Sequence, residues 1–152
     1  MKNTFYTLIF SCCLLTWTPM FGQDAEGPIF QAGAAPSVIT PPIGYSINGG
    51  MQDRVVRNVH DETLARALVI DDGETRLAFV VSDLCMIYRE TLDKAKQRAQ
   101  EFTGIPTENM MMSATHTHSA GTACGVFQSD PEPEYLDFLS VRIADALIRA
   151  NE

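Results

Sequence analysis

The chain has 152 residues, of which 45% are hydrophobic, and this length and composition fit one globular domain rather than a disordered chain. It carries 11 Lys and Arg against 19 Asp and Glu, so its formal net charge is −8. This balance argues against a nucleic-acid partner and against electrostatic docking on anionic lipid. The acidity mainly indicates solubility.

The N-terminal segment, residues 1–23, has the pattern of a secretory signal peptide. Lys2 precedes an apolar run from Phe5 to Trp17, and a polar segment follows. The run is shorter than the roughly 20 residues that span a bilayer, so an uncleaved anchor is the less favoured alternative. We expect cleavage near Gly22 or Gln23 and a secreted or periplasmic product.

The cysteines divide into two groups. Cys12 and Cys13 lie within the apolar run and belong to the predicted signal peptide. Cys85 and Cys124 remain in the mature part, where they could pair in an oxidising compartment or stay free, partly buried thiols. No C-x-x-C pattern is present, so the sequence does not support a zinc site built from thiolates.

The mature part begins with a predicted strand over residues 28–35, which a long loop over residues 37–62 follows. Paired prolines in this loop cannot occupy a strand, and Gly44, Gly49 and Gly50 permit close backbone approach. A structureless stretch of this length is uncommon unless it serves a binding site, a flexible linker being the alternative.

The next segments predict a hairpin, a helix and another strand. Two apolar runs, 64–70 and 76–81, flank an Asp-Asp-Gly-Glu turn and should pair antiparallel. Residues 88–102 have helical periodicity, with an apolar side formed by Leu92, Ala95, Ala99 and Phe102. The strand predicted at 110–114 should lie parallel to its predecessor after a right-handed crossover, which predicts an α/β fold with a mixed sheet.

A last helix is predicted to open between residues 130 and 134, with Asp130 as its N-cap. Its apolar stripe should pack in the core and consists of Tyr135, Leu136, Leu139, Ile143 and Leu147. The chain stops at the end of this helix without a further strand, so we expect residues 24–152 to be an incomplete part of a larger domain.

Two histidines, His116 and His118, follow the strand at 110–114. On an extended chain they would leave the same side about 6 to 7 Å apart and could converge on one metal ion or substrate oxygen. Asp83 also follows a strand, and ligands of open α/β sheets bind beyond such carboxyl ends. The alternative is that both histidines are satisfied or exposed beside a turn and that Asp83 is a structural turn residue. The remaining histidine, His60, lies in the long loop.

Several motifs, in this order, resemble the N-terminal portion of the neutral/alkaline non-lysosomal ceramidase family, and the resemblance covers about residues 29–152. The segment Ala114-Thr115-His116-Thr117-His118-Ser119 is its most specific element. The other matching segments are 32–35, 39–44, 59–69 and 104–109.

The resemblance implies a zinc-dependent amidohydrolase that cleaves the N-acyl bond of ceramide or a related lipid amide. His116 would then be a zinc ligand, and His118 would lie beside the metal and contact the reacting group. The family's other zinc ligands lie later in its domain, so we expect this chain alone to bind zinc weakly and to be nearly inactive.

Two other functions remain open. One is a non-catalytic ceramidase-like binding or structural module, which would lack the remaining zinc ligands. The other is an unrelated metal hydrolase that uses the H-x-H pair. Transient membrane contact and the oligomeric state are also open.

Overall fold

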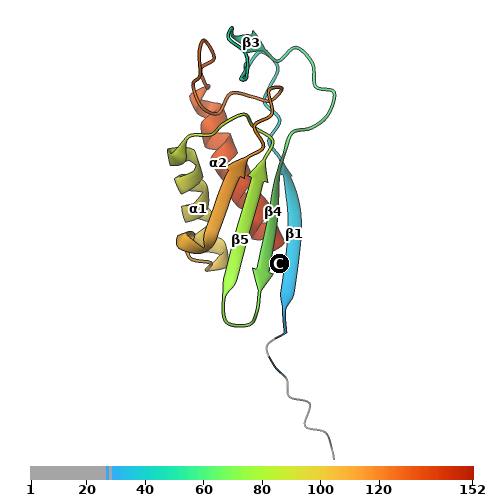
Figure 1. The fold of residues 1–152 in the computed structure, drawn as a ribbon, viewed down its shortest axis with the longest axis vertical. Coiled ribbons are helices and arrows are strands. Elements are labelled where there is room, and N and C mark those ends of the chain that lie inside the picture. The colour runs from blue at the N-terminus through green and yellow to red at the C-terminus, as the bar shows by residue number, and fades with distance from the viewer. Residues whose placement is uncertain (1–26, 28) are drawn as a thin grey trace, which may run out of the picture.

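The computed structural model describes residues 27 and 29–152; the predicted signal peptide, residues 1–23, lies outside this part. The described chain forms a four-stranded sheet with two helices on one face (Figure 1). Its elements are β1 (Gln31–Val38), β2 (Ser46–Ile47), β3 (Arg54–Val55), β4 (Leu64–Asp71), β5 (Arg76–Ser82), α1 (Arg89–Thr103), a 3₁₀ turn η1 (Thr107–Asn109), β6 (Met110–Ala114) and α2 (Pro133–Ala150).

The sheet has the strand order β1-β4-β5-β6. Its first three strands pair antiparallel, whereas β5 and β6 are parallel, so the prediction of a mixed α/β sheet is confirmed. The hairpin between β4 and β5 is also confirmed, and the carboxylate of Asp72 accepts hydrogen bonds from the N–H groups of Glu74 and Thr75. Such bonds to a turn are the reason that Asp is common there.

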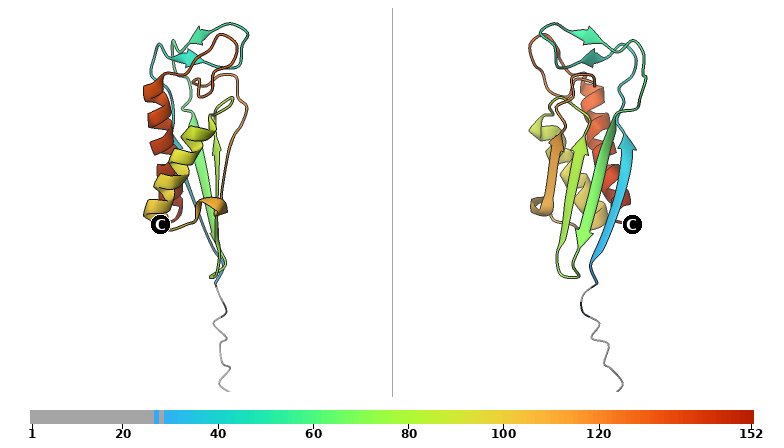
Figure 2. Two further views of the ribbon diagram at one scale, coloured as in Figure 1. Left: turned by 90° about the vertical axis from the view of Figure 1, so that its left-hand side faces the viewer. Right: turned by 45° about the vertical axis from the view of Figure 1, so that its right-hand side comes forward.

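The core lies between the sheet and the helices (Figure 2). The apolar stripe of α2 is buried as predicted, with Leu136 only partly covered. Tyr135, the first residue of the stripe, is buried and donates a 2.6 Å hydrogen bond to the backbone carbonyl of Ile39. Because the phenol is buried, its pKa is raised.

Two details of the predicted helices were wrong. The N-cap of α2 is Glu132, without a side-chain cap, rather than Asp130. A proline disfavours helical backbone in the residue before it, so Pro133 keeps Glu132 extended and the helix begins at Pro133 itself. In α1, Phe102 is exposed and lies under the Arg98 guanidinium, because the buried side runs through Ala95 and Ala99 to Thr103 instead.

The first strand and the loop after it also differ from expectation. β1 runs to Val38, three residues beyond the predicted end. The long loop contains the short antiparallel pair β2 and β3, in which Ser46 faces Val55. Strands of two residues are too short for alternation to reveal them. The pair lies beyond the carboxyl ends of β5 and β6, at the top of Figure 1.

The sheet face opposite the helices carries mostly apolar side chains. Leu68, Val81 and Met111 point to this face from β4, β5 and β6 and are exposed. Arg66 lies on the same face of β4. The left view of Figure 2 shows both helices on the other side of the sheet. We call this surface the outer sheet face.

None of the described helices is long and apolar enough to cross a membrane.

Candidate metal centre

The carboxyl ends of β5 and β6 bring two loops together. The two strands pair in parallel up to Ser82 and Ala114. Backbone pairing then continues beyond the strands, since the N–H of Thr115 donates to the Ser82 carbonyl and the N–H of His116 to the Leu84 carbonyl, both at 3.0 Å. Residues just after β5 therefore lie beside the histidine segment, as the sequence predicted.

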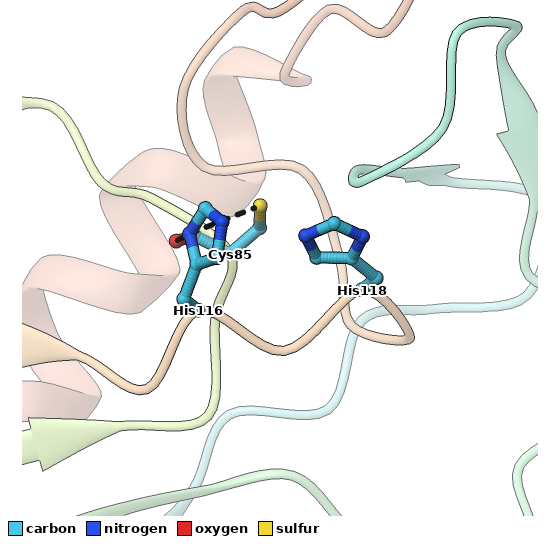
Figure 3. Close-up of side chains that lie close together, drawn as sticks. All are labelled: Cys85, His116 and His118. Carbon is cyan, nitrogen blue, oxygen red and sulfur yellow. Dashed lines mark hydrogen bonds between the residues drawn. The ribbon is translucent and has the colours of Figure 1, made fainter.

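The histidine segment is not an extension of the strand, contrary to prediction. β6 ends at Ala114, and His116 has a φ of 64°, in the left-handed region that side chains other than glycine rarely adopt. The rings of His116 and His118 nevertheless lie on the same side, with centroids 5.0 Å apart and planes at 73° (Figure 3). Local backbone strain of this kind is frequent at functional sites.

Cys85 lies beside the two imidazoles (Figure 3). One potential ligand atom from each of Cys85, His116 and His118 lies within 4.8 Å of the other two. Cys85 as a residue is 4% exposed, whereas both histidines are exposed. The cluster therefore has a buried sulfur at its base and two nitrogens at its solvent side. Cys85 was not predicted to take part.

The tautomer of His116 follows from its hydrogen bonds. Its Nδ1 lies 2.9 Å from the backbone carbonyl oxygen of Cys85 and 3.7 Å from the Cys85 sulfur. A carbonyl can only accept, so Nδ1 carries the proton and donates to it. The lone pair of the neutral ring is then on Nε2, which is the usual arrangement for a histidine that binds a metal.

The long loop positions His118. The Arg54 guanidinium donates to the backbone carbonyl of His118 at 2.8 Å and to that of Asn48 at 3.4 Å. Gly49, with a φ of 106°, lies directly against the His118 side chain, where an added Cβ would be 2.5 Å from Cβ and Cγ of the histidine. Thus the predicted close approach of the glycine-rich loop is observed at Gly49.

The other polar residues considered from the sequence lie outside this cluster. Asp83 accepts hydrogen bonds from the Leu64 N–H at 3.0 Å and from the Arg66 guanidinium at 2.7 Å, and this contact raises the pKa of Arg66. These bonds match the structural turn role. His60 is 90% exposed and pairs with Asp61. Both Asp83 and His60 line a cleft of about 440 Å³ that Thr117 and Ser119, the neighbours of His118, also line.

Comparison with known proteins finds neutral ceramidases among the similar sequences. No family model matches the chain. It is 36% identical over 133 residues to neutral ceramidase A of Dictyostelium discoideum, covering 77% of this chain and 17% of that protein. It is 30% identical over 128 residues to the neutral ceramidase of Pseudomonas aeruginosa, covering 78% and 18% respectively. The chain contains a region of the neutral ceramidase family. This region spans less than a fifth of the length of these curated relatives.

Solved structures agree with the fold of this ceramidase-family region. The crystal structure of neutral ceramidase from Pseudomonas aeruginosa matches it with a TM-score of 0.70 at 24% identity, over 82% of this chain and 22% of that one. A ceramidase complexed with C2 matches with a TM-score of 0.67 at 24% identity, over 82% and 21%.

The donor set of the cluster fits a zinc ion. Thiolate sulfur and imidazole nitrogen are the ligands that zinc takes most readily in proteins. A tetrahedral site places its ligand atoms roughly 3.3–3.6 Å apart, given zinc–ligand bonds of about 2.0–2.3 Å. The potential ligand atoms here lie within 4.8 Å of one another, so they would move closer by roughly 1 Å to hold one ion.

Cys124 is a poorer candidate than Cys85. Both are free thiols in this structure, so the alternative of unpaired cysteines is the one observed. Burial raises the pKa of the Cys124 thiol, and the nearby Cys85 and Glu90 raise it further. Its backbone carbonyl accepts a 2.7 Å hydrogen bond from the Asn48 side chain. Cys124 therefore supports the loop that carries Gly49.

Proposed function

We propose that residues 24–152 are the amino-terminal part of a secreted zinc-dependent amidohydrolase of neutral ceramidase type. Its reaction would be hydrolysis of the N-acyl amide bond of ceramide or a related lipid amide. The observation that carries the proposal is the His116 and His118 pair, held at converging strand ends in a ceramidase-family region. The solved ceramidase complexed with C2 supports a lipid amide as substrate.

In this proposal His116 is a metal ligand. Its Nδ1–H donates to the Cys85 carbonyl, which fixes the ring and directs Nε2 away from the backbone. Zinc bound there would supply Lewis-acid chemistry, polarising the amide carbonyl and activating water. The exposed ring of His116 lies at the solvent side of the cluster, where a substrate can reach it.

His118 would lie beside the metal and act on the substrate. Its ring lies 5.0 Å from that of His116, centroid to centroid, and is exposed. An imidazole N–H at this position can donate to the carbonyl oxygen of the scissile amide as negative charge develops on it. Arg54 and Gly49 fix the backbone and side chain of this histidine.

The test combines zinc analysis with an amide hydrolysis assay. Zinc content after dialysis should fall in a His116→Ala, His118→Ala variant and should be retained in His60→Ala, because His60 is an exposed histidine outside the cluster. Hydrolysis of an N-acylsphingosine should be measured in the protein as its gene encodes it and should be lost in His116→Ala. Full activity and full zinc content in His116→Ala would refute the proposal.

A second candidate is a non-catalytic ceramidase-like binding or structural module. It is favoured by the composition of the cluster, which among the described residues contains one thiol and two imidazoles and no carboxylate. This candidate predicts zinc binding or lipid amide binding without hydrolysis in the same assays.

Export is tested separately. We propose that residues 1–23 are removed as the protein is secreted or enters the periplasm, and N-terminal sequencing of the exported product should begin near residue 24. Retention of the full N-terminus in the cell would contradict it.

A further inference from the structure

We propose that the thiolate of Cys85 is itself a metal ligand, so that this chain holds a divalent, borderline-soft cation such as zinc through one sulfur and at least one imidazole nitrogen. The inference rests on the metal site proposed above for His116 and extends it to a residue of another loop. As the sulfur–metal bond forms, the thiol releases its proton to solvent.

The position of the sulfur supports this assignment. Cys85 follows β5 by three residues and His116 follows β6 by two, and the hydrogen bond from the His116 N–H to the Leu84 carbonyl holds the two segments together. The sulfur is 3.7 Å from Nδ1 of His116, and a ring nitrogen of each histidine lies within 4.8 Å of it. The segments that follow β5 and β6 thus place the sulfur and the imidazole nitrogens close together.

Cys85 contributes in two ways. Its backbone carbonyl accepts the Nδ1–H of His116, which leaves Nε2 as the donor atom of that ring. Its side chain supplies the sulfur. One residue therefore fixes the tautomer of one ligand and provides another, so the relative placement of His116 and the sulfur depends little on distant loops.

Charge and burial favour a zinc-like cation over a hard one. Two neutral imidazoles and one thiolate carry a single negative charge and no carboxylate oxygen, a set that suits zinc or cobalt(II) and not magnesium or calcium. Cys85 is buried and the histidines are exposed, so a bound ion would face solvent on the histidine side. Further ligands or a substrate could approach from that side.

Cobalt(II) is the probe that reports sulfur ligation directly. The purified 152-residue chain is loaded with cobalt(II) under anaerobic conditions, and its absorption spectrum is recorded. Thiolate ligation produces a near-ultraviolet charge-transfer band, while the visible d–d bands report a bound ion whatever its ligands. We expect both features in the wild type and in Cys124→Ser, the matched control.

Two variants assign the band to Cys85. Cys85→Ser should lose the charge-transfer band and weaken zinc affinity by at least roughly 10-fold, since removal of groups that only support a metal ligand already costs about 10- to 100-fold. A variant with Cys12, Cys13 and Cys124 all replaced by Ser leaves Cys85 as the only thiol, and it should retain the band. This second variant keeps the test decisive even if Cys85→Ser does not fold.

The outcomes separate the two proposals. Visible bands without a charge-transfer band in the wild type would overturn the assignment of Cys85 and leave the histidine site standing. Loss of the band in the single-thiol variant would assign the sulfur to another cysteine and also overturn it. An absence of all cobalt bands in the wild type would overturn both proposals for this chain.

Discussion

Gly49 lies directly against the side chain of His118, so that an added Cβ would be 2.5 Å from Cβ and Cγ of the histidine. Gly49→Ala should therefore displace His118 and weaken metal binding. The alanine would also be strained at a φ of 106°, which lowers the stability of the fold. Zinc affinity by competition with a chromogenic chelator measures the first effect, and urea denaturation measures the second.

Gly44 provides the matched control. Its φ is 93°, yet an added Cβ there would have nothing within 4 Å. Gly44→Ala should cost about 1 kcal/mol of stability from backbone strain alone and leave zinc affinity unchanged. Equal zinc affinity in the two variants would show that Gly49 does not position His118.

The phenol of Tyr135 should make the protein sensitive to alkali. Tyr135→Phe removes its hydrogen bond to the Ile39 carbonyl and should cost about 1–3 kcal/mol at neutral pH. Burial raises the pKa of this phenol, so its contribution is fully present below pH ~10 and declines above it, where the unfolded phenol ionises and the folded one stays protonated.

The stability difference between wild type and Tyr135→Phe should therefore shrink as the pH rises above ~10. Urea denaturation of both proteins across this range measures it. If the stability difference between the two proteins stays constant or widens with pH, the phenol of Tyr135 is not buried and protonated in the folded state. Tyr45, whose ring contacts Tyr135 edge-on, provides a control at neutral pH, where Tyr45→Phe should cost less.

Asp83 should affect stability and not metal binding. Asp83→Ala leaves the Leu64 N–H without its acceptor and breaks the pair with Arg66, at an expected cost of about 1–2 kcal/mol. Arg66→Ala should cost less, about 0–1 kcal/mol, because the arginine is about half exposed. Zinc loss in a folded Asp83→Ala protein would instead place this carboxylate in the metal site.

The outer sheet face should drive self-association of the isolated chain. Leu68 lies on central strand β4, flanked in register by Ala34 and Phe79, and is exposed. Leu68→Lys should reduce association at high concentration, measured by sedimentation velocity. Phe102→Lys, at an exposed apolar position of α1, is the control and should leave association unchanged. Equal association in Leu68→Lys and wild type would exclude this face.

Much of the fold could be predicted because it depends on local patterns. Alternating apolar residues and an Asp-Gly turn identify the hairpin of β4 and β5, and the glycine at 104 ends α1 with a φ of 71°. The side of α1 that is buried depends on where α2 lies, which no local pattern encodes. The periodicity therefore predicts Phe102 on the apolar side of the helix, whereas Thr103 is the residue buried there.

The candidate site was predictable only in part. The histidine pair has a motif, and its place after β6 follows from the strand pattern. The participation of Cys85 depends on parallel pairing between β5 and β6 across a long sequence separation, and the left-handed backbone of His116 has no signal in a non-glycine residue. The observation that Cys85 and His116 each closely follow a strand of the same pair could have suggested their meeting.

The backbone pairing beyond β5 and β6 divides the cluster into two parts with different dynamics. The His116 amide is bonded to the Leu84 carbonyl as a continuation of the sheet, so its hydrogen exchange should be slower than that of amides in the long loop. His118 is held by Arg54 and by contact with Gly49, both on the long loop, which can open locally. An ion could thus enter or leave through movement of the His118 side alone, while the sulfur and the His116 ring keep their places.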